Sequence, residues 1–341
     1  MNSVSIAMAT YNGKSYIGEQ LASLANQSVA PAELIVTDDC SNDGTLDVIG
    51  HFAITAPFPV RIFKNERRIG HRENFMHAAS LCTSDLIAFC DQDDIWDPKK
   101  LETCIAYFGD PDVLLTYHNA IVIAADRRSI GTLDAFAAPL TVNPPLSINP
   151  WLFGLGFTQI FRRSLPSLLG FWSTSVNHSL PDEPMAHDQW YFFLASVLGS
   201  IVYVKEPLAY YRRHGTNHTP WDPKASKVYS LKGAFSFAMD SYAGQEKVAL
   251  RRAEILAEAG EELSLRFQER ASVGEIRYRR LANHYASRKK IYTALKLRDR
   301  LDAFLDILSS GGYRRNDSWN FSRKSFLKDA GLGILAGHLL K

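Results

Sequence analysis

Three carboxylates stand within four positions in the segment Asp91-Gln92-Asp93-Asp94, directly after an apolar run. Like charges this close repel one another and destabilise a fold unless a cation offsets them. Hard oxygen ligands suit Mg²⁺ or Mn²⁺, and such ions usually also bind substrate phosphates. The segment therefore predicts a divalent metal site. The alternative is a solvated turn that caps the helix expected from Asp97 onward.

The elements that position this segment alternate along the first 120 residues. Repeated strand–helix units imply a mainly parallel sheet with helices on both sides. The first helix carries Ile17, Leu21 and Leu24 on one face and is expected to begin with Ser15 as its N-cap. Strands are expected at 4–9, 34–36, 60–63, 86–89 and 113–117, and helices at 15–24, 45–52, 72–81 and from Asp97-Pro98 onward.

Polar residues follow three of these strands at their carboxyl ends. They are Thr10-Tyr11-Asn12, Asp38-Asp39 and the acidic segment from Asp91 to Asp94. Ligands of parallel α/β sheets bind beyond the carboxyl ends of the strands. We therefore expect the three clusters to surround one ligand.

The rest of the chain changes character twice. Residues 121–225 are looser and rich in proline and aromatic residues, which suits an acceptor-binding and catalytic half. Residues 226–341 are mostly helical, with Gly311-Gly312 expected as a hinge before a last short helix at 326–340. The predicted fold is an α/β sheet domain over 1–225, with halves 1–120 and 121–225, followed by a helical C-terminal extension over 226–341.

The net charge of +2 hides an asymmetry. Residues 1–240 hold 18 Lys and Arg against 24 Asp and Glu, a net charge of −6, whereas residues 241–341 hold 20 against 12, a net charge of +8. Within 277–300 nine cations face only Asp299, and Tyr278, Leu281 and Tyr285 share a helical face. This pattern is typical of an amphipathic helix on an anionic membrane surface. The alternative is a solvated face packed on the sheet domain or on a second subunit of a homo-oligomer. Nucleic acid is not expected, because the cations lack interleaved aromatic residues.

The four cysteines, Cys40, Cys82, Cys90 and Cys104, lack the paired spacing of a zinc site and are expected as reduced, mostly buried thiols. No signal peptide is expected, because the apolar run from Val4 to Ala9 is short and lacks a basic segment before it. No membrane helix is expected either, because no apolar run reaches the about 20 residues that it needs. These features predict a cytoplasmic protein, with peripheral contact at the inner membrane as a further expectation for the basic region.

The polar clusters and the strands before them together resemble glycosyltransferase family 2, the inverting enzymes of the GT-A fold. Each motif alone is weak, but the set is specific, and it is most similar to the bacterial rhamnosyltransferase-like branch. The resemblance implies a GT-A-type nucleotide-binding sheet flanked by helices. The matching segments occur in family order over residues 3–110, with weaker matches to 220: Val4-Ser5-Ile6-Ala7-Met8-Ala9-Thr10-Tyr11-Asn12, Leu34-Ile35-Val36-Thr37-Asp38-Asp39-Cys40-Ser41-Asn42-Asp43-Gly44-Thr45, then Asn65, Gly70 and Asn74, and Phe89-Cys90-Asp91-Gln92-Asp93-Asp94-Ile95-Trp96.

The resemblance implies a nucleotide site at the strand tips. Asp39, together with Asp38, is expected to accept a hydrogen bond from the N3–H of uracil or thymine, which cytosine lacks; the alternative is a turn that leads into the next helix. Asp91 is expected at the ribose. Arg72 is expected at the diphosphate or the donor sugar, with an exposed arginine at a helix start as the alternative. The expected nucleotide contacts are Thr10, Tyr11, Asn12, Asp38, Asp39, Arg72, Asp91 and Gln92.

The same resemblance implies the metal ligands and the catalytic base. Asp93 and His214 are expected to hold Mn²⁺ or Mg²⁺, with a plain surface histidine as the alternative for His214. Asp188 matches the base that takes the proton of the acceptor hydroxyl, with an ordinary helix N-cap as the alternative. His187 stands where the family usually has a second acid. The residues expected at the diphosphate or the acceptor are Asp94, Trp151, His187, Arg212 and Arg213.

The implied function is a metal-dependent, inverting transfer of a sugar from a UDP- or dTDP-sugar to a glycan or lipid-linked acceptor in the synthesis of a cell-surface polysaccharide. A nucleotidyltransferase, the first alternative, would carry a glycine-rich phosphate loop where this chain has Thr10-Tyr11-Asn12-Gly13-Lys14. A non-catalytic nucleotide-sugar-binding protein, the second, would lack the base or the metal carboxylates, but Asp188, Asp91 and Asp93 are present.

Overall fold

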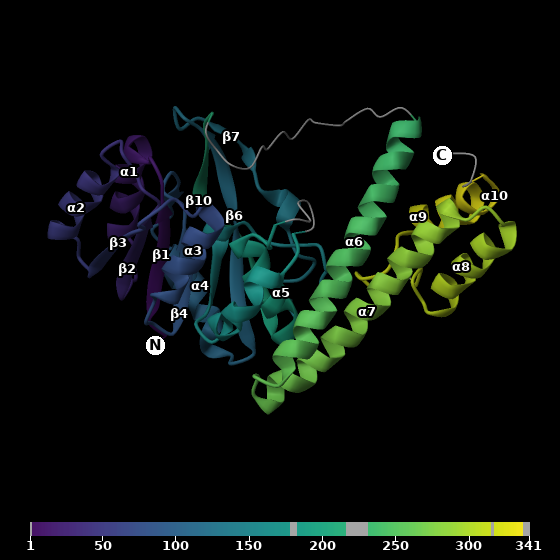
Figure 1. Cartoon of the computed structure of the whole chain (residues 1–341). Helices are drawn as coiled ribbons and strands as arrows, with labels where there is room; N and C mark the ends of the chain where they lie inside the picture. Colours follow the sequence, from purple (N-terminus) through teal and green to yellow (C-terminus); the bar gives the residue numbers. More distant parts are fainter. Residues whose placement is uncertain (1, 178–182, 216–230, 315–316, 337–341) are drawn as a thin grey trace. The chain divides into compact units, whose positions relative to one another are not determined.

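The computed structural model describes residues 2–177, 183–215, 231–314 and 317–336 (Figure 1). The chain forms two compact units. The first lies within residues 1–169 and 186–219, and the second lies within residues 170–185 and 220–341. The predicted domain boundary at residue 225 lies outside the described residues. Residues 170–185 group with the helical unit, which the sequence did not predict.

The first unit is an α/β unit built on one sheet. Its strands are β1 (Val4–Thr10), β2 (Glu33–Asp38), β3 (Val60–Lys64), β4 (Leu86–Cys90), β5 (Ile95–Trp96), β6 (Val113–Ala124), β7 (Ser129–Thr132), β8 (Val142–Asn143), β9 (Gln159–Arg162) and β10 (Ser200–Arg213). Its helices are α1 (Lys14–Ala25), α2 (Thr45–Thr55), α3 (His71–Ser80), α4 (Lys100–Ile105) and α5 (His187–Leu198). The strand order is β3-β2-β1-β4-β9-β6-β10-β5, with β7 beside β6 and β8 beside β10.

The half of the sheet formed by β3, β2, β1 and β4 is parallel, as the repeated strand–helix units predict. Every residue of β1, β2 and β4 is buried, whereas β3 forms the edge and is largely exposed. Because parallel strands are joined by right-handed crossovers, α1 and α2 cover one face of this half and α3 covers the other. The carboxyl ends of β1, β2 and β4 meet at one edge, so the three polar clusters lie together. The predicted α/β fold is confirmed.

The other half of the sheet is mixed. β9 runs antiparallel between β4 and β6, and β5 is antiparallel to β10. β6 and β10 are parallel to each other. The expectation of mainly parallel pairing therefore holds for the first four strands and not for the later ones.

Two predicted helix starts are shifted. α1 begins at Lys14, with Gly13 rather than Ser15 at its N-cap and no side-chain cap. The helix expected from Asp97-Pro98 begins at Lys100, after a turn in which the Lys100 N–H donates to the Asp97 carbonyl (3.0 Å). The pairing of β5 with β10 fixes the chain immediately before this turn and delays the helix.

The second unit is helical. Its helices are α6 (Leu231–Gly260), α7 (Leu265–Thr293), α8 (Leu297–Ser309), α9 (Arg323–Lys328) and α10 (Ile334–Ala336), with a π-helical turn between the last two. The fully buried Asp329 accepts hydrogen bonds from Tyr292 (2.6 Å) and Tyr313 (2.8 Å) and pairs with Arg288 (2.8 Å). This network joins α7 to the C-terminal helices. The single helix expected at 326–340 corresponds to α9, the π-helical turn and α10, which follow one another directly from Arg323 to Ala336. Its last expected residues lie outside the described ones.

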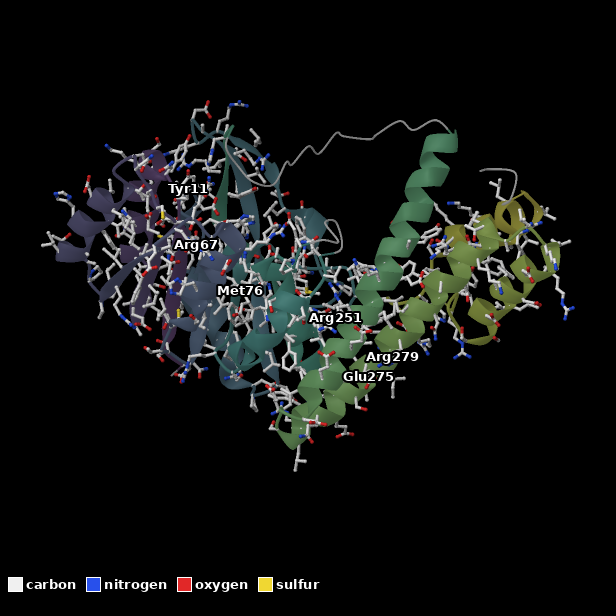
Figure 2. All side chains as sticks on the ribbon, in the orientation of Figure 1. Tyr11, Arg67, Met76, Arg251, Glu275 and Arg279 are labelled. Atoms are coloured by element: carbon white, nitrogen blue, oxygen red, sulfur yellow. The ribbon has the colours of Figure 1, made fainter. Side chains whose placement is uncertain are left out.

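The apolar face predicted within residues 277–300 belongs to the core of the second unit. Tyr278 is fully buried with its ring 4.7 Å from that of Trp319, and Tyr285 is buried as well. On the exposed side of α7, Arg279 pairs with Glu275 (2.8 Å) along the helix (Figure 2). Tyr278 and Tyr285 of this pattern therefore pack inside the unit. Across the described ranges, every helix is too short or too polar to traverse a bilayer.

Candidate active site

The tips of β1 and β2 hold each other through hydrogen bonds. Asp38 is fully buried, and its carboxylate accepts from Thr10 Oγ1 (2.8 Å), from the Ser41 N–H (2.8 Å) and from Ser41 Oγ (2.5 Å). Asn12, at φ 48°, donates its N–H to Ser41 Oγ (2.9 Å) and accepts from the Asn42 N–H (3.0 Å). The side chains of Thr10 and Asp38 are buried in these contacts. They fix the strand tips, and the contact of Thr10 and Asp38 with a nucleotide stays a prediction.

Asp39 organises the loop that leads into α3. Its Oδ1 accepts from the Ile69 N–H (2.7 Å) and from Asn65 Nδ2 (3.1 Å), and its Oδ2 accepts from the Gly70 N–H (2.8 Å). Gly70 has φ 89°, a conformation that only glycine adopts without strain. A carboxylate offers about four acceptor positions. Within the described part of the chain, three of them are filled and one remains on Oδ2.

Tyr11 and Gln92 join the tip of β1 to that of β4. The Tyr11 N–H donates to Gln92 Oε1 (2.9 Å), and Gln92 Nε2 donates to the Tyr11 carbonyl (3.0 Å). Gly13 leaves room for this pair, because a Cβ there would lie 2.2 Å from Gln92 Oε1. The Tyr11 ring is partly exposed and lies 3.8 Å from the Arg68 guanidinium. Gln92 thus positions a loop, and Arg68 is a neighbour of Tyr11 that the sequence did not reveal.

The three carboxylates of the acidic segment converge. One oxygen from each of Asp91, Asp93 and Asp94 lies within 4.8 Å of the others. Asp94 is fully buried; its Oδ1 accepts from the Arg212 N–H (3.0 Å), and its Oδ2 has no hydrogen-bond partner among the described residues. Burial, followed by the charge of Asp93, raises the pKa of Asp91 to about 8 and the pKa of Asp94 well above its usual range. A divalent cation would satisfy the orphaned oxygen and offset these charges, so the residues fit the predicted metal.

His214 lies next to the acidic cluster. Its Nε2 is 2.7 Å from Asp93 Oδ2, and its ring stacks on that of Tyr16 in α1, with the ring centroids 4.6 Å apart. The two residues that the sequence paired as metal ligands, Asp93 and His214, are therefore in contact although 121 positions separate them. Tyr16 orients the imidazole and was missed in the sequence.

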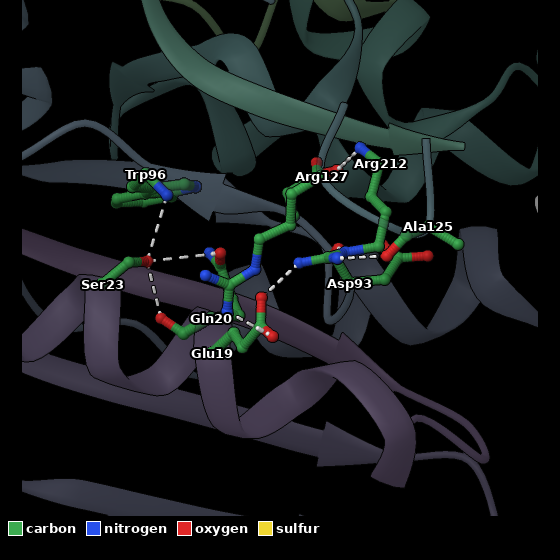
Figure 3. Close-up of polar contacts among 9 residues, drawn as sticks. Glu19, Gln20, Ser23, Asp93, Trp96, Ala125, Arg127 and Arg212 are labelled. Carbon is green, nitrogen blue, oxygen red and sulfur yellow. Dashed lines mark hydrogen bonds and ion pairs between the residues drawn. The ribbon is translucent and has the colours of Figure 1, made fainter. Parts of the chain in front are cut away.

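Arg212 is buried and holds the acidic segment in place (Figure 3). Its Nε donates to the Asp93 carbonyl (2.9 Å), its Nη1 donates to the Ala125 carbonyl (3.3 Å), and its Nη2 pairs with Glu19 Oε2 (2.5 Å). Arg127 pairs with the other oxygen of Glu19 (2.6 Å). The protein itself engages this guanidinium, and the contact of Arg212 with a diphosphate or an acceptor stays a prediction. Arg212 is a positioning residue.

Asp188 stands at the start of α5, close to the acidic cluster. It is 8% exposed, and its Oδ1 accepts from the Gln189 N–H (2.8 Å). Burial raises the pKa of Asp188 to about 6, against the lowering effect of backbone hydrogen bonds and of the Arg72 charge. The charge of Asp188 in turn helps to raise the pKa of Asp91. Asp188 therefore lies within electrostatic reach of both Arg72 and Asp91.

His187 packs into the core. Its side chain is buried, and its ring stacks on Phe75 (4.0 Å between centroids) and meets Phe89 edge-on (4.9 Å). Burial lowers the pKa of His187 well below its usual range, so the imidazole is neutral at pH 7. The expected contact of His187 with a diphosphate or an acceptor stays a prediction. The ring supports the start of α5 behind Asp188.

Arg213 and Trp151, the remaining predicted contacts, are both partly exposed. Arg213 ends β10, and Trp151 begins the loop that leads to β9. The buried Gln159 connects that loop to the start of α5, because its Nε2 donates to the carbonyls of Gly154 (2.6 Å) and Asp188 (3.1 Å). Gln159 is a positioning residue that no sequence motif identified.

A buried lysine lies close to the acidic cluster. Lys100 has no exposed surface; its Nζ donates to the Phe157 carbonyl (2.6 Å) and lies 3.3 Å from the ring centroid of Trp96. Burial lowers the pKa of Lys100 to about 7, although the charges of Asp94 and Asp91 act to raise it. A cation here offsets part of the negative charge of the cluster. The sequence does not indicate that Lys100 is buried, because lysine in the first turn of a helix is usually exposed.

Lys100→Met is expected to destabilise the metal-free protein by about 1–3 kcal/mol, since it leaves the buried Phe157 carbonyl unpaired and removes a countercharge from the carboxylates. Mn²⁺ should recover part of this loss by supplying the missing positive charge. Urea unfolding with and without Mn²⁺ measures both effects. Lys99→Met, at the exposed neighbour, is the matched control. Equal losses with and without Mn²⁺ would mean that Lys100 acts through packing alone.

The sequence model of the family described as "Glycosyl transferase family 2" matches residues 5–169. The match contains the tips of β1, β2 and β4 and the acidic cluster, while Asp188 and β10 lie beyond it. Four curated relatives are 27–32% identical to this chain, which spans 60–66% of their length.

Other similar proteins have more specific names. The UDP-Glc:alpha-D-GlcNAc-diphosphoundecaprenol beta-1,3-glucosyltransferase WfgD of Escherichia coli is 29% identical over 57% of this chain and 69% of its own. The dTDP-rhamnosyl transferase RfbG of Shigella flexneri is 35% identical over 29% of this chain and 35% of its own. The crystal structure of S. aureus TarS 1-349 in complex with UDP-GlcNAc matches 92% of this chain and 93% of that chain with 18% identity and a TM-score of 0.49. Over residues 5–169, the chain is therefore similar to glycosyl transferase family 2.

Proposed function

We propose that this protein is an inverting, metal-dependent glycosyltransferase that uses a UDP- or dTDP-sugar as donor and Asp188 as base. The observation that carries the proposal is the electrostatic grouping of Asp188 with Asp91 and Arg72 beside the carboxylates of the acidic cluster. An inverting transfer needs a base for the acceptor and positive charge for the departing diphosphate. These residues supply both within one site.

The uracil or thymine base is proposed to bind at Asp39 and Tyr11. Asp39 Oδ2 accepts one hydrogen bond, from the Gly70 N–H, and so has an acceptor position left for an imide N3–H. The Tyr11 ring, with the Arg68 guanidinium 3.8 Å from its centroid, is proposed to supply a flat surface for the base. Asn12 is proposed to line the same part of the site.

Asp93 and His214 are the proposed ligands of Mn²⁺ or Mg²⁺, with Asp94 completing the cluster and Asp91 at the ribose. When bound, the ion would stabilise the negative charge that develops on the leaving diphosphate. Arg212 holds the backbone of this segment. The ligands therefore depend on a support that is present before any ion binds.

The chemistry proposed for the side chains is a single displacement. With a pKa of about 6, the Asp188 carboxyl is mostly ionised at pH 7 and accepts the proton of the acceptor hydroxyl as that oxygen attacks the anomeric carbon. The bond from this carbon to the diphosphate breaks on the opposite face, which inverts the configuration. Arg72 and Arg213 are proposed to offset the charge on the diphosphate, and Trp151 to contact the acceptor.

A glycan or lipid-linked acceptor in the synthesis of a cell-surface polysaccharide is proposed on the basis of the relatives. The name of WfgD states a UDP-Glc donor and a sugar on a diphosphate lipid, and that of RfbG states a dTDP-rhamnosyl donor. Both donors carry an imide base and a diphosphate, so Asp39 accommodates either. Rhamnosyl transfer is therefore one form of the proposed activity.

A thermal-shift screen of nucleotides tests this proposal. UDP and dTDP with Mn²⁺ are expected to raise the melting temperature, because a ligand at a hundred times its Kd stabilises the folded state by about 2.7 kcal/mol. CDP and GDP should have little effect. Stabilisation by GDP alone would refute base recognition by Asp39. A product that keeps the anomeric configuration of the donor, measured by NMR, would refute the inverting mechanism.

A further inference from the structure

The second unit contains a pocket of about 370 Å³, and the charged residues of its lining, within the part of the chain that the structure describes, are three arginines and one aspartate. Arg277 and Arg280 come from α7 and, three positions apart, lie on the same side of the helix. Arg314 and Asp317 come from the segment that follows α8. Guanidinium groups gathered around one cavity repel one another, and an anion between them relieves this repulsion.

Part of this lining is held in place by contacts within the unit. The Arg277 guanidinium lies 4.8 Å from the ring centroid of the buried Trp319, and its Nη2 is 2.7 Å from Asp317 Oδ2. Arg280 Nη2 lies 4.0 Å from the same oxygen. A single carboxylate oxygen therefore already faces two of the arginines. Groups that are ordered in advance reduce the entropy cost of binding a ligand.

The charge of the pocket suits a phosphate. Among the described lining residues, three guanidinium groups and one carboxylate leave a formal charge of +2. A phosphate monoester carries about −1.5 to −2 at pH 7, and arginine binds its oxygens through paired hydrogen bonds. The side chains of Arg280 and Asp317 are 45% and 28% exposed, so solutes reach the pocket.

We propose that this pocket binds a phosphate or diphosphate group, as an anion site separate from the acidic cluster of the first unit. The inference is independent of the proposed transfer reaction, since none of its residues takes part there. Two sources offer the same chemistry: a dissolved phosphoryl compound and the phosphate head group of a lipid. The experiments distinguish them.

The first experiment titrates the full-length protein with inorganic phosphate and with pyrophosphate by calorimetry, in EDTA so that no metal contributes. The double variant Arg280→Ala/Arg314→Ala should bind at least about tenfold more weakly, because charge-assisted hydrogen bonds are lost. Arg279→Ala is the matched control, since Arg279 lies on the same helix but pairs with Glu275 and does not line the pocket. Asp317→Asn should bind more tightly, because it removes the competing carboxylate. A misfolded variant would lose affinity for phosphate, so tighter binding by Asp317→Asn cannot be caused by misfolding.

The second experiment sediments the protein with phosphatidylcholine vesicles, with and without phosphatidic acid. Binding that requires phosphatidic acid and is lost in the double variant identifies a lipid head group as the source. Binding of phosphate or pyrophosphate without such sedimentation identifies a dissolved ligand. The proposal is overturned if neither phosphate, pyrophosphate nor phosphatidic acid binds, which leaves a purely structural ion pair. It is also overturned if Arg279→Ala weakens binding as much as the double variant does.

Discussion

Asp188→Asn is expected to lower the rate of glycosyl transfer by about 10²- to 10⁴-fold, which is the contribution that a positioned general base typically makes. The amide has nearly the shape of the carboxylate, and its oxygen can still accept from the Gln189 N–H. Binding of the donor should therefore be unchanged. The measurement is the release of UDP or dTDP in the presence of acceptor, together with the thermal shift that the nucleotide produces.

A matched control for this variant is Asp302→Asn, in which the aspartate is 56% exposed on α8 and outside the site. Its transfer rate should equal that of the natural chain. Unchanged turnover in Asp188→Asn would eliminate this residue as the base and would leave it the role of a helix N-cap.

The pH profile measures the same carboxyl independently. Burial raises the pKa of Asp188 to about 6, so the base is protonated below this pH and ionised above it. Transfer should rise with pH through about 6 and then level off. The free energy of unfolding should change in the opposite direction. The pKa of Asp188 in the folded protein lies above its unfolded value of about 3.9, so the protonated carboxyl stabilises the folded state. This contribution is lost as the pH rises from about 4 to 6. Asp188→Asn should lack both transitions.

Asp93→Ala is expected to abolish the Mn²⁺-dependent part of the thermal stabilisation, about 2.7 kcal/mol at a hundred times the Kd of the ion. Asp93 supplies one of the three clustered oxygens and contacts His214 at 2.7 Å, so its removal opens the proposed ligand set. The Asp93 carbonyl still accepts from Arg212, which keeps the segment in its place. Differential scanning fluorimetry with UDP, with and without Mn²⁺, measures the loss.

Asp85→Ala is the control for this second variant. Asp85 lies at the amino end of β4, whereas the acidic cluster follows the carboxyl end of the same strand. The Asp85 carboxylate accepts from the Ser3 N–H (2.9 Å). This change should leave the effect of Mn²⁺ intact. A full Mn²⁺ shift in Asp93→Ala would show that the ion binds elsewhere.

Much of the half of the sheet formed by β1 to β4 could be predicted from the sequence, because its strands and helices are indicated by patterns of neighbouring residues. Alternating apolar runs and helices identify β1 to β4, and parallel strands bring their carboxyl ends to one edge. Three carboxylates directly after a buried strand then have to lie close together, and the structure confirms that they do.

The roles that the sequence leaves open depend on which way a side chain points. Arg212 and Arg213 are neighbours on β10, and successive residues of a strand face opposite sides. One of them therefore had to face away from the other, but the sequence does not say which. His187 and Asp188 raise the same question at the start of α5. That helix is buried on nearly all sides, so no polar face indicated its orientation.

Other residues depend on partners far away in the sequence. Lys100 is buried because the Phe157 carbonyl, 57 positions later, accepts its hydrogen bond. In α7 the pattern showed an apolar face correctly, but an amphipathic pattern does not reveal whether its partner is a membrane or the same chain. The structure shows aromatic residues of the same unit in that place.

The contacts of Arg212 and His214 with Asp93 have a consequence for synthesis on the ribosome. These residues follow Asp93 by 119 and 121 positions, which takes roughly 6 to 24 s at elongation rates of about 5–20 residues per second. A nascent chain that has paired its first four strands therefore still lacks the anchors of its acidic segment. The proposed metal site is therefore complete only late in synthesis, when β10 joins the sheet.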